Sequence, residues 1–197
     1  MWKAATMVFA TALALPALAQ HGGHGAASPY AGEQRREIKS LSAEDIAELR
    51  RGGGWGLAKP AELNGMPGPA HLLELKERIP LTPDQVKAID ALFQAMRRDA
   101  IAEGERLIAH ERALDNAFRN RAVTHESLRE MLAAIEASRA ALRYVHLAAH
   151  LATPALLTEA QIARYNQLRG YGVDPCANVP AGHDPALWRR HNGCAGD

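Results

Sequence analysis

The chain has 197 residues and a formal net charge of +1, with 23 lysines and arginines against 22 aspartates and glutamates. This balance gives no electrostatic argument for binding nucleic acid or an anionic membrane surface. Aromatic residues make up only 5% of the chain, while alanine, leucine, glutamate and arginine are abundant. This mixture favours helices over strands, so we expect an all-α protein with no nucleic-acid partner.

The N-terminal stretch MWKAATMVFATALALPALAQ has the pattern of a secretory signal peptide. Lys3 precedes an apolar run that ends at Leu15, and a proline and the small-residue pattern Ala-Leu-Ala follow, ending at Ala19. The run of about twelve apolar residues is shorter than the roughly 18 expected of a membrane span. We therefore expect cleavage after Ala19, which removes Lys3 and takes the net charge from +1 to 0. The mature chain should be exported, form one domain and not insert into a membrane.

Residues 20–68 are expected to form a flexible tail and then an arm of short helices. The tail sequence QHGGHGAASP is too rich in glycine and small residues to pack. Its histidines, His21 and His24, could bind copper or zinc weakly, or they could be incidental to a glycine-rich spacer.

The arm combines helix signals with turn signals. The stretch EQRREIKS predicts a helix, and Ser42 with Asp45 resembles a capping box that opens a second short helix ending at Arg51. The glycines and prolines that follow predict short turns up to residue 68. Pro69 then suits the first turn of a brief helix that runs to Arg78.

The stretch LTPDQ predicts the start of a long helix. Thr82 can cap the helix and Gln85 can reach back to the cap. Apolar residues then recur at spacings of three, four or seven as far as about Arg121, nearly 40 residues, and Gly104 is a point where this helix could bend. Thr124 can cap a second long helix.

The second long helix is expected to run from His125 to about Ala152. The connection to the first helix is short, so the two should form an antiparallel hairpin. LTEAQ begins a third helix, with Thr158 as its cap and Gln161 at its third position, and Gly170 ends it.

Two L-T-x-x-Q frames therefore bracket a long hairpin in a chain with a signal peptide. The residues that carry this pattern are Leu81, Thr82, Gln85, Leu157, Thr158 and Gln161. In this respect the chain resembles the Spy/CpxP family, also called the LTXXQ family, best over residues 69–172. The resemblance implies a periplasmic, cradle-like, antiparallel homodimer that acts in envelope stress without a nucleotide. It implies binding of unfolded client proteins, modulation of an envelope sensor protein, or metal sensing.

Two histidines near the end of the second long helix form a candidate metal site. His146 and His150 stand four residues apart, so both can face one ion such as zinc, copper, nickel or cobalt. His110 is a third candidate ligand if the hairpin brings it beside His146. The sequence HLAAH lacks the glutamate of a metalloprotease helix. The alternative is that His146 flanks the apolar stripe while His150 points outward, both without a metal.

The same helix end, YVHLAAHLATPALL, is apolar almost all the way round. Leu147 and Leu151 lie off the stripe that contains Leu142 and Val145. Such a helix must be covered on several sides or must present an apolar surface to a partner. We therefore expect these four residues to form a dimer or client surface, or to be covered by the N-terminal arm.

The C-terminal segment, residues 173–197, contains Cys176 and Cys194. In an exported chain they are expected to pair as a disulfide. The alternative is a metal site that also uses His183 and His191, although the spacing does not match the usual zinc patterns.

No catalytic motif is found in the chain. GGGWG lacks the spacing of a dinucleotide-binding loop, and no G-x-S-x-G elbow occurs. We therefore expect a binding protein and not an enzyme, with no required cofactor. The leading hypothesis is a Spy/CpxP-like chaperone or envelope-stress modulator, and the alternative is a periplasmic heavy-metal sensor or metal-binding protein that uses His146 and His150.

Overall fold

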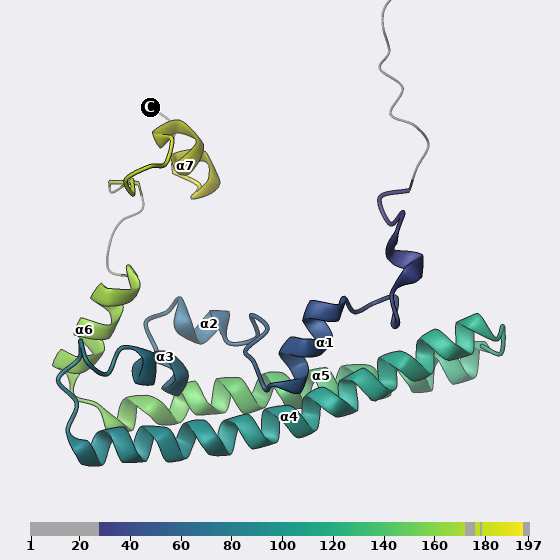
Figure 1. Cartoon of the computed structure of the whole chain (residues 1–197), viewed down its shortest axis with the longest axis horizontal. Coiled ribbons are helices and arrows are strands. Elements are labelled where there is room, and N and C mark those ends of the chain that lie inside the picture. Colours follow the sequence, from purple (N-terminus) through teal and green to yellow (C-terminus); the bar gives the residue numbers. More distant parts are fainter. Residues whose placement is uncertain (1–27, 172–175, 178, 195–197) are drawn as a thin grey trace, which may run out of the picture. The chain divides into compact units, whose positions relative to one another are not determined.

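The structure is a computed structural model that describes residues 28–171, 176–177 and 179–194. The predicted signal peptide, its cleavage site, His21 and His24 lie outside the described residues. Every regular element in the described part is a helix (Figure 1), so the prediction of an all-α fold is confirmed. Across these same residues, no helix combines the length and the apolar character that crossing a membrane requires. The chain divides into a short N-terminal segment ending at Gln34 and a unit that begins at Arg35.

Two long helices form the largest feature of the second unit. Helix α4 spans Pro83–Arg119 and helix α5 spans His125–Ala152. At 1.5 Å per residue, α4 is about 55 Å long. Arg121 in the connection has a φ of 54°, the left-handed conformation of a tight turn. The helices pack against each other (Figure 1), consistent with the predicted antiparallel hairpin.

The three helix starts that were predicted at threonine caps are present. Thr82, Thr124 and Thr158 each accept a hydrogen bond from the backbone of the residue three positions later, and the side chain at that position bonds back to the cap backbone. After α5, a 3-10 helix, η2, covers Thr153–Leu156 and helix α6 covers Glu159–Arg169. Gly170 ends α6 with a φ of 78°, which suits glycine because it has no Cβ.

The N-terminal arm differs in part from its prediction. The stretch EQRREIKS contains only a short 3-10 helix, η1, at Glu33–Arg35, and helix α1 spans Ala43–Arg50. Helix α2, Lys59–Glu62, occupies part of the segment that was predicted as turns. Helix α3, Pro69–Glu74, stops before the predicted end at Arg78. Local propensity placed α1 correctly because a complete capping box begins it, whereas the short neighbouring helices depend on packing.

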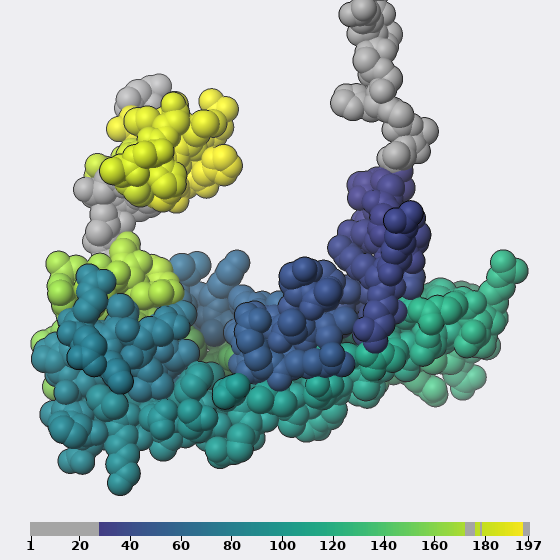
Figure 2. All heavy atoms as spheres, viewed as in Figure 1, coloured from purple at the N-terminus to yellow at the C-terminus, as the bar shows by residue number. Residues whose placement is uncertain are grey.

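The arm packs onto the hairpin and does not lie free. Figure 2 shows α1 and its neighbouring residues, in blue, against the teal surface of α4. Their apolar side chains enter one core cluster with both long helices, formed by Ile38, Leu41, Ile46, Leu49, Ala100, Leu107, Ile108, Ile135 and Leu142. Burying a leucine or isoleucine side chain stabilises by about 1.5–3 kcal/mol, so the arm is a substantial part of the fold.

Gly104 allows this close packing. A Cβ at this position would lie 2.6 Å from the carbonyl oxygen of Leu49, at the end of α1. The residue that was considered as a bend in α4 is therefore required where α1 meets the hairpin.

A second core cluster lies where α3, the start of α4 and α6 meet. It is built on Leu72, Ile79, Ile89 and Tyr165, all buried. Leu81 and Leu157, the leucines of the two L-T-x-x-Q frames, pack against this cluster. The frames therefore lie at the base of the hairpin.

The C-terminal part contains helix α7, Pro185–His191, where one turn of helix was expected. None of its residues is buried. Cys176 and Cys194 form a disulfide, in agreement with the expected pairing.

Candidate functional site

The two L-T-x-x-Q frames bond directly to each other. The side-chain amides of Gln85 and Gln161 form two reciprocal N–H···O bonds, each 2.9 Å long. Each amide nitrogen also donates, at 2.8 Å, to the carbonyl just before the leucine of the other frame, Leu156 in one case and Pro80 in the other. The two helix starts are thus joined by a symmetrical set of hydrogen bonds.

This arrangement saturates both glutamines. Each amide oxygen accepts a bond from its own threonine backbone and one from the other glutamine. Gln161 is buried, and a buried amide with all its bonds made stabilises a unique arrangement. The frames are therefore structural: they cap α4 and α6 and hold the beginning of α4 to the segment after α5.

His146 and His150 lie on one side of α5, as the spacing predicts, but both are buried, with exposed fractions of 3% and 7%. The expectation that His150 points outward is wrong, because its Nδ1 donates at 2.8 Å to the carbonyl oxygen of Met66. Burial lowers the pKa of His146, the neighbouring His150 adds to this effect, and the Gly53 backbone opposes it. His146 is therefore neutral near pH 7, and no described residue forms a hydrogen bond with its Nε2.

His110 does not join these two histidines. Its Nδ1 lies 3.0 Å from the hydroxyl of Ser138, two helical turns before His146 on α5. Two turns correspond to about 11 Å along the helix, too far for one metal ion. In the described part of the chain, no group of three or more histidine, cysteine, aspartate and glutamate side chains is placed to hold a metal.

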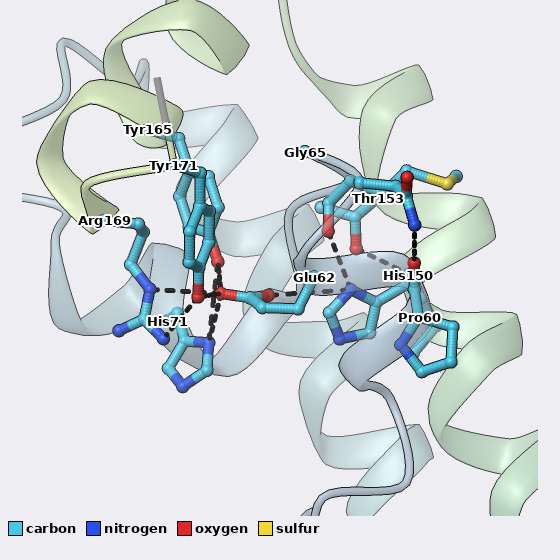
Figure 3. A network of polar contacts seen from close by, with 12 residues as sticks. Pro60, Glu62, Gly65, His71, His150, Thr153, Tyr165, Arg169 and Tyr171 are labelled. Atoms are coloured by element: carbon cyan, nitrogen blue, oxygen red, sulfur yellow. Dashed lines mark hydrogen bonds and ion pairs between the residues drawn. The ribbon is translucent and has the colours of Figure 1, made fainter. Parts of the chain in front are cut away.

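Glu62, at the end of α2, is the centre of a buried polar network (Figure 3). Its Oε1 accepts bonds from the hydroxyls of Tyr165 at 2.5 Å and Tyr171 at 2.8 Å and from Arg169 Nε at 3.0 Å. His71 Nδ1 is 3.3 Å from the same oxygen. Burial acts to raise the Glu62 pKa, but the donors His71, Tyr165 and Tyr171 outweigh it and lower the pKa to about 2. Glu62 is therefore a carboxylate at any physiological pH.

A cavity of about 700 Å³ opens beside this network. Residues from the glycine-rich segment after α1, from α2 and α3, and from both long helices line it. The lining includes Glu62, His146 and His150 together with the apolar side chains of Trp55, Leu63, Phe93 and Met96. The predicted metal pair, His146 and His150, therefore lines the same cavity as Glu62.

Of the four residues predicted to form a client or dimer surface, the structure places two in or against the core and two away from it. Leu142 is fully buried in the core and Val145 packs against it, so Leu142 is not a surface residue. Leu147 is half-buried and Leu151 is 67% exposed. Tyr144, one turn before Leu147, is 70% exposed.

Tyr144, Leu147 and Leu151 form one apolar stripe. At about 100° per residue, these positions lie on the side of α5 opposite Leu142 and Ala149, which face the core. The apolar residues of the arm that enter the first core cluster pack against the core side of the hairpin. We call these three residues the α5 stripe.

The disulfide removes both cysteines from any metal site. The two sulfurs are 2.05 Å apart, and the loop spans 18 residues. His183 packs edge-on against the ring of Trp188, and His191 Nδ1 is 3.1 Å from the carbonyl of Leu187. The alternative of a Cys/His metal site in this segment is therefore not favoured.

Comparisons with models of protein families, with curated proteins and with solved structures found no match to this chain. The resemblance to the Spy/CpxP family rests on its residues alone.

The sequence did not single out Glu62 or Tyr144. Glu62 lies in a glycine- and proline-rich stretch. Its partners, Tyr165, Arg169 and Tyr171, are more than 100 residues away along the chain. No local pattern marks such a residue. Tyr144 could have been found, since it continues the spacing of Leu147 and Leu151 on the off-core side of the helix.

Proposed function

We propose that this chain is an exported, periplasmic binding protein of the Spy/CpxP kind that holds unfolded client proteins without a nucleotide. The observation that carries the proposal is the α5 stripe, which leaves Tyr144 and Leu151 about two-thirds exposed on a well-formed helix. Single exposed apolar residues are common on protein surfaces, whereas apolar residues grouped along one helix face, here two exposed and one half-buried, suit an interaction surface.

The rest of the fold supports this role. The crossed bonds of Gln85 and Gln161 fix the base of the hairpin, so the stripe lies on a rigid element. The disulfide is consistent with an oxidising compartment outside the cytoplasm. The chain has almost no net charge, so client binding would depend on apolar contact and respond weakly to salt.

The test is suppression of aggregation of a chemically denatured client by the mature chain at a stoichiometric ratio. The double variant Tyr144→Ser, Leu151→Ser should lose most of this activity. The matched control is Tyr30→Ser, Leu187→Ser, which replaces the same two residue types at positions that are 71% and 53% exposed outside the hairpin. The control should keep the wild-type activity.

Two outcomes would reject the proposal. One is a wild-type chain that leaves client aggregation unchanged. The other is a stripe variant that keeps full activity but loses a homodimer in sedimentation analysis, because the stripe would then be a subunit contact. No observation favours the metal-binding alternative, since His146 and His150 have no third ligand among the described residues.

A further inference from the structure

The Glu62 carboxylate is bonded very unevenly. Its Oε1 has four donors within 3.5 Å, whereas its Oε2 is buried and has no hydrogen-bond partner in the part of the chain that the structure describes. His150 Nδ1 lies 3.9 Å from Oε2 (Figure 3), which is beyond hydrogen-bond distance. That nitrogen already donates to the carbonyl oxygen of Met66. A buried carboxylate oxygen without a donor destabilises the folded chain, so its retention beside a cavity needs an explanation.

His146 is a second unsatisfied group on the same cavity. It is 3% exposed, burial lowers its pKa so that it is neutral, and its Nε2 has no partner among residues 28–171, 176–177 and 179–194. His150 lies beside it on the same cavity, and its Nδ1 bonds the carbonyl oxygen of Met66. Gly68 makes room for that ring: a Cβ there would lie 2.5 Å from Nε2.

These polar groups share the cavity with apolar walls. Trp55, Phe93 and Met96 line it, and its volume of about 700 Å³ falls within the usual range for small-molecule sites. A ligand that fits must supply hydrogen-bond donors at one end and apolar surface at the other.

The geometry points to a binding site for a small organic amine with an apolar body, whose ammonium group bonds Glu62 Oε2 and His146 Nε2. An ammonium has three donors and no acceptor, which matches a carboxylate oxygen and a neutral imidazole, whose Nε2 accepts when its proton is on Nδ1. Bonds to an ionised acceptor are about twice as strong as neutral ones, so an amine should bind better than an alcohol of the same shape.

The charges that line the cavity are compatible with a cation at this position. Arg51 is paired with Glu48, and Arg169 with Glu62 Oε1. Lys59 and Arg97 also line the cavity, but both are exposed. Water and salt screen exposed charges more strongly than they screen the buried Glu62.

The test titrates the mature chain with 2-phenylethylamine and with 2-phenylethanol, which have the same apolar body. Calorimetry should give one amine site per chain and an affinity at least about tenfold higher than for the alcohol. His146→Phe should weaken amine binding by about tenfold or more. This variant loses an Nε2 that has no partner among the described residues, together with the contact of His146 with the Gly53 backbone, so circular dichroism must first show that it is folded. The matched control is His110→Phe, which changes a histidine outside the cavity and should leave the affinity unchanged.

A second measurement does not depend on any variant. In the wild-type chain, the imidazole ¹⁵N resonances of His146 should shift on adding the amine, while those of His110 should not. Absence of saturable amine binding up to about 10 mM, equal affinity for the alcohol, or unchanged His146 resonances would each overturn the proposal.

Discussion

The crossed glutamines allow a quantitative prediction. Replacing Gln161 with alanine removes four hydrogen bonds: two from its oxygen and two from its nitrogen. At about 1 kcal/mol net for each bond, the variant should lose about 2–4 kcal/mol of unfolding free energy. Gln85→Ala should be similar in kind but smaller, because Gln85 is less buried.

The two effects should not add. Two of the bonds join Gln85 to Gln161, so both single variants lose the same pair. The double variant should therefore lose about 1–3 kcal/mol less unfolding free energy than the two single variants lose in total.

Urea unfolding followed by circular dichroism at 222 nm would give these values. The slope of the unfolding free energy against urea concentration should stay the same if the unfolded state is unaffected. The matched control cycle uses Gln94→Ala and Gln167→Ala, two exposed glutamines that do not bond each other, and should show no coupling. A coupling below about 0.5 kcal/mol between Gln85 and Gln161 would refute the role of the crossed bonds.

Three further results are expected. Gly104→Ala, which would normally stabilise a helix, should instead destabilise by about 1–3 kcal/mol in urea unfolding, because the new methyl group meets the Leu49 carbonyl; a gain in stability would contradict the close contact. Glu62 has a folded pKa of about 2 against an ordinary 4.5, so its contribution of about 3 kcal/mol to the unfolding free energy is complete above pH 4.5 and is lost as the pH falls towards 2. Glu62→Gln should therefore flatten the dependence of stability on pH between 4.5 and 2, and an unchanged slope would contradict this role of Glu62. Replacing Cys176 and Cys194 with serine should speed amide exchange in α7, which buries no residue, and leave the hairpin's unfolding within about 0.5 kcal/mol; equal exchange with and without the disulfide would show that something else holds α7.

The helix starts could be predicted from the sequence because capping is local. Thr82 and Gln85 are three residues apart, and their mutual bonds need no other part of the chain. The same holds for Thr158 and Gln161. The hairpin followed from the apolar spacing between these starts and from the short connection, which leaves two long helices few other ways to pack.

The packing of the arm could not be predicted in this way. The sequence shows a short capped helix and many glycines, but it does not show that Leu49 lies on Gly104. The crossed bonds between Gln85 and Gln161 were equally hidden, because an amide at the third helical position already has a local partner in the cap. Partners more than 70 residues apart emerge only when the tertiary contacts are known.

The histidines show the same limit. Their spacing placed His146 and His150 on one face of α5, but only the tertiary structure shows that both are buried. The acidic residue beside them, Glu62, comes from a segment with no periodic pattern. The cavity is therefore a tertiary feature even though its two histidines are four residues apart.

The most direct test of client binding is a contact measurement at the α5 stripe. A photoreactive phenylalanine analogue at position 144 should crosslink to an unfolded client, and the same analogue at position 30 should not, although Tyr144 and Tyr30 are 70% and 71% exposed. Strong crosslinking at position 144 that persists in high salt is the predicted result. Equal crosslinking at both positions, or none at position 144, would contradict the proposal that the α5 stripe holds clients.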